Sequence, residues 1–221
     1  MTEKASTTED YRRALEANAA RYEVHLSAPM SEQLCDYYQE VQRWNRRVHL
    51  VAPCSPAEFA TRHVLESLLA TVYLPLHAHV ADIGSGAGLP IIPCLIARAD
   101  IRATLYEASL KKAVFLRETL RRLNLHDRTV VIAERFERRR APEINAATCR
   151  ALDRFTELFS TILAWCPKQS TLLLFGGHAL REKIEDFALS FRERLIPLSN
   201  QRYLFIIKER PITQFDLTRE T

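Results

Sequence analysis

The sequence predicts an α/β fold in which helices cover both faces of a mostly parallel sheet, with a helical extension at the N-terminus. From residue 79 onward, short apolar runs alternate with longer helical segments, which is typical of βαβ units. In the first 75 residues, apolar side chains instead recur at the three- and four-residue spacing of amphipathic helices. We therefore expect a helical extension over residues 1–75, packed on a sheet domain over residues 76–221.

Three helices are expected in the extension. Thr7, with Asp10 at the capping-box offset, predicts the start of a helix that runs toward His25. A second helix follows Pro29, and one face of it carries a row of apolar residues at Leu34, Tyr37, Tyr38, Val41, Trp44 and Val48.

The third helix has the clearest start. Ser55 is expected to cap it, Pro56 suits its first position and Glu58 would complete a capping box. Pro75 is expected to end it. Its core-facing residues would be Leu65, Leu68, Leu69 and Val72.

Apolar runs in the rest of the chain predict the strands, of which the earlier ones should be buried on both faces. These runs lie at residues 79–83, 103–106, 129–132, 146–149, 171–175 and 203–207. The helices between them are expected at residues 89–98, 110–123, 154–165 and 178–193. A right-handed crossover joins each parallel pair in such a fold.

Composition and charge narrow the class of protein. With 47% hydrophobic and 26% charged residues, the 221-residue chain has the balance of a globular protein. Its apolar runs fall short of the about 20 residues that cross a bilayer, and its first ten residues are polar, unlike a secretory signal. We expect a cytoplasmic protein without a membrane segment.

The basic side chains are concentrated in one part of the chain. Residues 81–140 carry 12 basic and 7 acidic side chains, which suits a polyanionic partner or a solvated helix face equally well.

The five cysteines predict buried free thiols. Their number is odd, and they form no Cys-x-x-Cys pair and have no histidines at ligand spacing, so neither a disulfide framework nor a metal site is expected. They are Cys35, Cys54, Cys94, Cys149 and Cys166.

Three of the five glycines lie between Gly84 and Gly88, directly after the strand predicted at 79–83. This turn is expected at the carboxyl edge of the sheet, where open α/β sheets bind ligands. Glycine allows positive φ there and lets the backbone approach a ligand. A dinucleotide fingerprint would need its last glycine at Leu89, and the phosphate-binding pattern Gly-x-x-x-x-Gly-Lys is missing. A purely structural glycine turn is the alternative.

An acidic residue accompanies this turn. Glu107 ends the next predicted strand, where a carboxylate can accept hydrogen bonds from both ribose hydroxyls of a nucleoside. Phe136 and Glu137 follow the third strand, where an adenine ring would bind. Although Glu107 alone could be a solvated strand end, its pairing with the glycine turn favours a nucleoside site.

The stretch Asp82-Ile-Gly-Ser-Gly-Ala-Gly88 resembles the glycine loop of class I methyltransferases, which bind S-adenosylmethionine. The Asp/Asn-Pro-Pro-aromatic loop that serves exocyclic amines is absent. Methylation of pyrimidine C5 needs a thiolate, and Cys149 fits the core better than that role. A ring nitrogen such as guanine N7 has a free lone pair, so its methylation requires in-line placement and no general base.

Further motifs make the resemblance specific. In chain order they are Trp44-Asn45, Arg62-His-Val-Leu-Glu-Ser67, Asp82 to Pro90, Glu107 with Lys111 to Leu116, Arg135-Phe-Glu137, Cys149-Arg-Ala151 and Arg202 to Lys208. Together, from about residue 31 to 209, they resemble the bacterial small-subunit (16S) ribosomal RNA guanine-N7 methyltransferases, the RsmG or GidB family.

The resemblance implies a Rossmann-like class I methyltransferase fold, S-adenosyl-L-methionine as cofactor, and action on small-subunit ribosomal RNA or an assembling ribosomal particle. We expect a monomer. The cofactor-binding residues it implies are Asp82, Gly84, Gly86, Gly88, Leu89, Glu107, Phe136, Glu137 and Arg150. The catalytic residues it implies are His63, Arg135, Arg150 and Arg202. The RNA-binding residues it implies are Arg62 and Lys111. Arg138 and Arg139 extend this basic surface and are further RNA-binding candidates, for which a solvated charge run is the alternative.

Three positions depart from the family pattern. Ile91 stands where a glycine is usual, Asn145 where an acidic residue is usual and Phe175 where a lysine is usual. Two other functions therefore stay open. One is a methyltransferase of the same fold that acts on another RNA or a small molecule, and the other is a non-catalytic RNA- or ribosome-binding protein.

Overall fold

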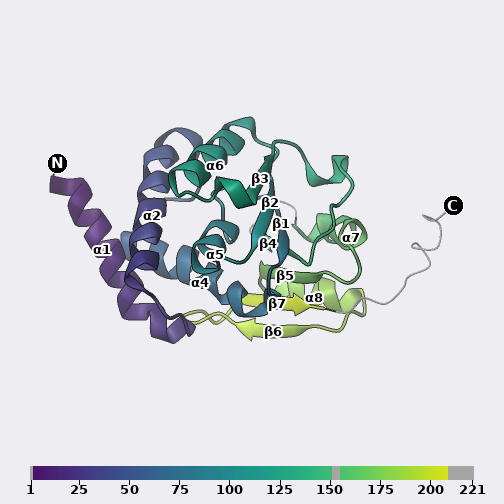
Figure 1. Ribbon diagram of the computed structural model, residues 1–221. Helices are drawn as coiled ribbons and strands as arrows, with labels where there is room; N and C mark the ends of the chain where they lie inside the picture. Colours follow the sequence, from purple (N-terminus) through teal and green to yellow (C-terminus); the bar gives the residue numbers. More distant parts are fainter. Residues whose placement is uncertain (1, 151–154, 209–221) are drawn as a thin grey trace.

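The computed structural model describes residues 2–150 and 155–208, and its core is a twisted sheet between two layers of helices (Figure 1). In this part of the chain seven strands form one sheet in the order β3-β2-β1-β4-β5-β7-β6. Their bounds are β1 His79–Ile83, β2 Arg102–Tyr106, β3 Thr129–Ile132, β4 Ala146–Arg150, β5 Thr171–Gly176, β6 Arg192–Leu195 and β7 Tyr203–Ile207. β1 to β5 are parallel, and β7 and β6 add an antiparallel edge, so the predicted fold class is confirmed.

All the predicted strands are present, but β6 was not predicted. Its residues Arg192, Glu193 and Arg194 are charged and lie at the edge of the sheet, so the apolar signal of a strand is missing. The helix predicted over 178–193 is wrong beyond residue 186. α8 (His178–Asp186) ends there, and the chain turns through Ala188 at a φ of +50°.

Helices lie on both faces of the sheet (Figure 1). α5 (Ile91–Ala97) and α6 (Leu110–Arg122) cover one face together with the N-terminal helices, while α7 (Phe155–Trp165) and α8 cover the other. Side chains that alternate along each strand feed the two core layers: Val80 contributes to the first and Ala81 to the second. As predicted, β1, β2, β4 and β5 are largely buried, whereas Val130 on the edge strand β3 is exposed.

The first two helices start differently from the sequence prediction. α1 spans Thr2–Asn18, so Thr7 lies inside a helix that it was expected to cap, and the short η1 (Ala19–Tyr22) follows. α2 spans Ala28–Val48, and the Ser27 hydroxyl caps it by accepting a hydrogen bond from the Met30 amide at 3.3 Å. Leu34, Tyr37, Tyr38 and Val41 are buried, as the spacing predicts.

The third predicted helix is broken into α3 (Pro56–Glu58), the π-helical η2 (Phe59–Leu65), α4 (Glu66–Leu68) and η3 (Leu69–Tyr73). Ser55 caps it as expected, with a hydrogen bond of 3.1 Å from the Glu58 amide to its hydroxyl. The Glu58 side chain does not complete the box, because it pairs with Arg62. Val72 is 66% exposed rather than buried, because η3 turns it away from the core.

The cysteines are free thiols; four are buried as predicted, whereas Cys54 is only half-buried. Burial raises the pKa of the Cys149 thiol well above its ordinary value, which disfavours a thiolate nucleophile at that position. None of the helices in the described ranges is long and apolar enough to span a bilayer.

The N-terminal helices reach the glycine loop through a buried hydrogen bond. The Tyr37 hydroxyl on α2 donates to the Ala87 carbonyl oxygen at 2.8 Å. The Tyr37→Phe variant is expected to lose about 1–2 kcal/mol of unfolding free energy, because it leaves a buried carbonyl without a partner. Urea unfolding would measure the loss. Tyr38→Phe is the matched control, because the Tyr38 hydroxyl has no hydrogen-bond partner among the described residues. It should lose less unfolding free energy than Tyr37→Phe.

Candidate functional site

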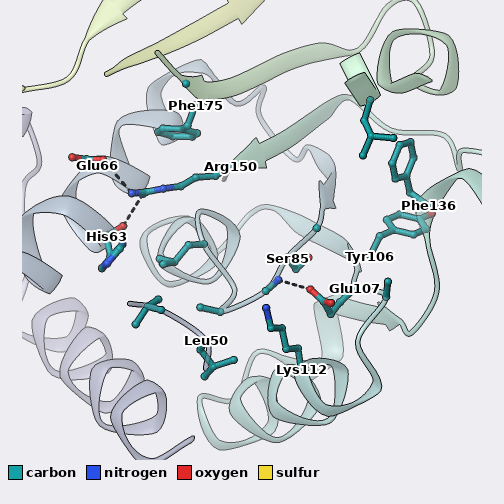
Figure 2. Close-up of a pocket in the computed structure, with 18 of the residues that line it drawn as sticks. Leu50, His63, Glu66, Ser85, Tyr106, Glu107, Lys112, Phe136, Arg150 and Phe175 are labelled. Carbon is teal, nitrogen blue, oxygen red and sulfur yellow. Dashed lines mark hydrogen bonds and ion pairs between the residues drawn. The ribbon is translucent and has the colours of Figure 1, made fainter. Parts of the chain in front are cut away.

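A cavity of about 720 Å³ opens at the carboxyl edge of the sheet, next to the ends of β1, β2, β4 and β5 (Figure 2). Its volume is within the range of small-molecule sites. The residues that line it come from segments far apart in the sequence: 50–52, 62, 63, 66, 84–87, 89, 106–108, 112, 134–137, 150, 158, 175–177, 196 and 202.

The glycine loop forms one wall of the cavity with bare backbone. Gly84, Gly86 and Gly88 all have positive φ, at +70°, +51° and +85°. The amides of Gly84 and Ser85 both donate to the Tyr106 carbonyl at 3.0 Å, which fixes the loop to the end of β2. A Cβ on Gly86 would meet little more than the Gly84 carbonyl at 3.7 Å, so the loop is open on the side of the cavity.

Glu107 faces this loop with both carboxylate oxygens fixed. Its Oε2 accepts a hydrogen bond from the Gly86 amide at 2.8 Å (Figure 2), and its Oε1 accepts one from the Ser109 amide, also at 2.8 Å. The residue is only 8% exposed, yet it lines the cavity. Each oxygen can accept a second hydrogen bond, so the carboxylate can receive two hydroxyl groups of a ligand.

Lys112 lines the cavity close to Glu107, whereas the predicted RNA-binding Lys111 is exposed and outside it (Figure 2). The sequence prediction did not include Lys112. The N-cap of α6 could have indicated that Lys112 faces the cavity. Ser109 accepts a hydrogen bond from the Lys112 amide, which fixes where the helix begins and therefore which of its side chains face the cavity.

An aromatic wall closes another side of the cavity. Phe136, in η5 (Phe136–Arg138), is 5% exposed and lines the cavity with Tyr106. Trp165 packs edge-on against both rings, with centroids 5.4 Å from Phe136 and 5.2 Å from Tyr106. Such a wall suits a planar ring. Glu137 and Leu89 also line the cavity.

Three of the four predicted catalytic residues gather on the opposite wall, around a carboxylate that the sequence prediction missed. Glu66 is 1% exposed and pairs with Arg150 at 3.1 Å and with Arg202 at 2.7 Å. Arg150 lies over the Phe175 ring at 5.5 Å, so the departure at Phe175 supplies a cation–π contact. His63 is beside them, and Arg135 lines the cavity next to Phe136.

His63 is uncharged at neutral pH. Burial, together with the nearby charges of Arg150 and Arg62, lowers the pKa of His63 to about 4. Its ring packs against Phe59 with a centroid distance of 5.0 Å. This low pKa disfavours a role as a cation near pH 7 and favours packing or hydrogen bonding.

Asp82 and Gly88 support the loop from behind and do not line the cavity. The Asp82 carboxylate is 1% exposed and accepts a hydrogen bond from the Thr148 hydroxyl at 2.6 Å on Oδ1. Its Oδ2 has no hydrogen-bond partner among the described residues. Burial raises the pKa of Asp82 to about 7.

This shift predicts a pH dependence of stability. Because the folded protein binds the Asp82 proton more tightly than the unfolded chain, the stabilisation is complete below about pH 4 and is lost as the pH rises through about 7. We expect the difference in unfolding free energy between the wild type and Asp82→Asn to decrease as the pH rises from about 4 to about 7. Denaturant unfolding of both proteins from about pH 4 to about pH 8 checks this, and parallel curves would contradict it.

The predicted RNA-binding arginines divide between two places. Arg62 lines the cavity. Arg138 and Arg139 line a second hollow with Arg102 and Trp165, and Arg139 forms an ion pair with Glu134 at 2.8 Å.

The other two departures have structural roles here. The Asn145 side chain accepts a hydrogen bond from the His79 amide at 2.8 Å and thereby joins β1 to β4. Ile91 is buried at the start of α5. Ala151, the last residue of the Cys149-Arg-Ala151 motif, and residue 154 of the predicted helix 154–165 lie outside the described residues.

The sequence matches one family of known proteins over most of its length. The family model described as rRNA small subunit methyltransferase G matches residues 30–199. The ribosomal RNA small subunit methyltransferase G of Dichelobacter nodosus is 31% identical over 204 residues, which cover 89% of this chain and 94% of the relative. The protein of the same name from Halorhodospira halophila is 30% identical over 83% of this chain and 87% of its own length.

Solved structures share the fold. An O-methyltransferase from Bacillus cereus, determined in complex with SAH, superposes with a TM-score of 0.58 at 15% identity, over 91% of this chain and 100% of that chain. An RNA methyltransferase from Salinibacter ruber superposes with a TM-score of 0.55 at 14% identity, over 74% and 97% of the two chains. The fold is therefore that of class I methyltransferases.

Proposed function

Because this chain belongs to the rRNA small subunit methyltransferase G family, we propose that it transfers a methyl group from S-adenosylmethionine to guanine N7 in small-subunit ribosomal RNA. The observation that carries the proposal is the pairing of Glu107 with the open glycine loop. Here a fixed carboxylate lies beside backbone that no Cβ covers, which is the arrangement a nucleoside-bearing methyl donor needs.

The residues present fit that cofactor. The cavity is large enough for it, Glu107 has acceptor capacity for two ribose hydroxyls, and Phe136 and Tyr106 offer apolar faces for adenine. When bound, the cofactor supplies an electrophilic methyl group on a sulfonium centre. The loop from Gly84 to Ala87 would then hold its amino acid end against backbone.

The chain's own side chains have few chemical tasks in this reaction. The N7 lone pair of guanine forms the new bond as the carbon–sulfur bond breaks, so no proton has to be removed and no general base is required. Neutral His63 and the Arg150–Glu66–Arg202 cluster are consistent with that requirement. Their task would be to orient the base and hold RNA phosphates, which raises the rate by alignment.

The test is methyl transfer from labelled S-adenosylmethionine to small ribosomal subunits that lack the modification, followed by mapping of N7-methylguanosine. Transfer to the subunits and not to free small molecules would support the proposal. Label on other RNA alone would favour a different acceptor. If calorimetry detected no binding of S-adenosylmethionine, a non-catalytic RNA-binding protein would be favoured instead.

The ribosomal substrate further implies a cytoplasmic protein, which we propose to act as a monomer on ribosomal RNA or on an assembling particle. Parallel assays with naked 16S RNA and with small subunits would distinguish these substrates. Sedimentation of the purified protein would measure its oligomeric state.

A further inference from the structure

The buried carboxylate of Glu66 joins two arginines from distant parts of the chain. Its Oε2 accepts a hydrogen bond from Arg150 Nη2, at the end of β4, at 3.1 Å. Its Oε1 accepts from Arg202, just before β7, with 2.7 Å to Nη2 and 3.2 Å to Nε. One side chain of α4 therefore fixes a guanidinium on β4 and another beside β7.

Arg150 has little freedom to contact a substrate. Its Nη1 donates to the His63 carbonyl and to the Ser67 hydroxyl, each at 3.2 Å, and its Nη2 also donates to the Arg62 carbonyl. Both carbonyls belong to the π-helical η2, a kind of turn that is frequent at functional sites. With the side chain only 13% exposed, Arg150 is an anchor for that turn (Figure 2).

Arg202 is held differently. Its side chain is 36% exposed and lines the cavity. Among residues 2–150 and 155–208, its side chain donates hydrogen bonds only to Glu66, and Nη1 donates none. Arg202 therefore keeps donor capacity for a ligand, and its orientation depends on Glu66.

Charge explains why this carboxylate is needed. Two guanidinium groups that share a half-buried wall repel each other, and an acidic group between them converts the repulsion into two ion pairs. Burial raises the pKa of Glu66, and both arginines oppose that increase. The cluster then keeps a net charge of +1, which can face RNA.

We propose that Glu66 is a positioning residue for methyl transfer: it holds Arg202 toward the methyl acceptor and uses Arg150 as a fixed anchor. The proposal rests on the proposed function above, which assigns the acceptor to this wall. Arg202 would contact the RNA, and Glu66 would act through it.

The chain offers a matched control at Glu40. This residue is 5% exposed on α2 and also pairs with two arginines, at 2.5 Å to Arg43 and 3.0 Å to Arg122, but it does not line the cavity. Glu66→Gln and Glu40→Gln therefore remove the same charge from similar surroundings. A loss of stability alone should affect the two variants alike.

We expect Glu66→Gln to lower kcat by about 10- to 100-fold, the size of effect that misplacement of a substrate-orienting group produces. Its Kd for S-adenosylmethionine should stay within about twofold of the wild-type value, because the proposed ribose and adenine contacts lie at Glu107 and Phe136, and Arg150 keeps its bonds to His63, Ser67 and Arg62. Glu40→Gln should keep the wild-type kcat per folded molecule. Equal kcat values in the two variants would overturn the proposal.

Two further variants separate positioning from packing. If Glu66 acts through Arg202, then Arg202→Lys should reduce kcat in the wild-type background and have little further effect in Glu66→Gln. Fully multiplicative effects would overturn the proposal. Glu66→Asp, which keeps the charge, should retain more activity than Glu66→Gln.

A readout that needs no catalysis distinguishes failure of this proposal from failure of the proposed function. The Nε proton of Arg202, bonded to Glu66, should exchange slowly with solvent in an NMR spectrum of ¹⁵N-arginine protein, and faster in Glu66→Gln. Unchanged exchange would overturn the holding of Arg202 by Glu66. If the wild type transferred no methyl group, the proposed function and the catalytic part of this proposal would both fail, whereas faster exchange would still support the holding of Arg202.

Discussion

The Glu107→Ala variant is expected to bind S-adenosylmethionine about 2–3 kcal/mol more weakly, a rise in Kd of about 30- to 150-fold. The variant would lose the hydrogen bonds that the Glu107 carboxylate is proposed to accept from the ribose hydroxyls, and hydrogen bonds to a charged group are stronger than neutral ones. The substitution also removes the acceptor of the Gly86 and Ser109 amides, so the glycine loop loses one of its links to the end of β2, while the bonds from Gly84 and Ser85 to the Tyr106 carbonyl remain. Isothermal titration calorimetry measures the change.

Two comparisons make this result specific. Glu118→Ala removes an exposed carboxylate from α6, outside the cavity, and should leave the affinity unchanged. Glu107→Gln keeps the size of the side chain and one oxygen acceptor, so its loss should be intermediate. Wild-type affinity in Glu107→Ala would show that the ribose binds elsewhere, and the proposed cofactor site would have to be abandoned.

The strands whose burial leaves an apolar signal could be predicted from the sequence. β7 was predicted with its observed bounds and β5 to within one residue, because Tyr203–Ile207 and Thr171–Gly176 are largely buried apolar runs. β6 could not be predicted, since an edge strand with Arg192 and Glu193 on it has no such pattern. The same reason accounts for the overlong helix predicted across it.

The half of the site built from local motifs was also accessible to prediction. The glycine turn follows one parallel strand and Glu107 follows the next, so both are expected at the same edge of the sheet. The structure brings Gly86 and Glu107 together there. That these residues bind a cofactor remains a proposal. Asp82 was assigned to the ligand by its place in the motif, whereas its side chain points into the core toward Thr148.

The other half of the site depends on contacts between distant segments. Glu66 and Arg202 are 136 residues apart in sequence, and no local pattern indicates that one pairs with the other. Their contact exists because β7 inserts beside β5 and brings Arg202 to the cavity. A lone acid in a helix is usually solvated, so burial of Glu66 could not be read from its neighbours.

The predicted division near residue 75 stays a prediction, and segments before it contribute to the cavity at the edge of the sheet. Asn45 closes the segment after α2: its Oδ1 accepts hydrogen bonds from the Leu50 and Val51 amides at 2.6 and 3.0 Å. Leu50 and Val51 both line the cavity. The N-terminal helices therefore supply part of the cavity wall, in addition to the Tyr37 bond to the glycine loop.

The Gly88→Ala variant is expected to lose about 2–5 kcal/mol of unfolding free energy, from strain at positive φ and from overpacking together. Its φ is +85°, and a Cβ there would lie 2.3 Å from Ile92 Cδ1 and 2.7 Å from Ile92 Cγ1. Since Ile92 is fully buried in α5, it has little room to move. Urea unfolding and the thermal midpoint would measure the loss.

Gly86→Ala is the matched comparison, because it has a similar positive φ but open space where the Cβ would be. It should lose only the cost of the strained backbone, about 1–2 kcal/mol. Ligand affinity should show the opposite order. Gly86→Ala should weaken it more than Gly88→Ala, because Gly86 lines the cavity and Gly88 packs behind it. Equal stability losses would mean that Ile92 yields without cost. Equal losses of affinity would mean that the loop acts as one rigid unit, in which the packing of Gly88 on α5 also determines how Gly86 meets the ligand.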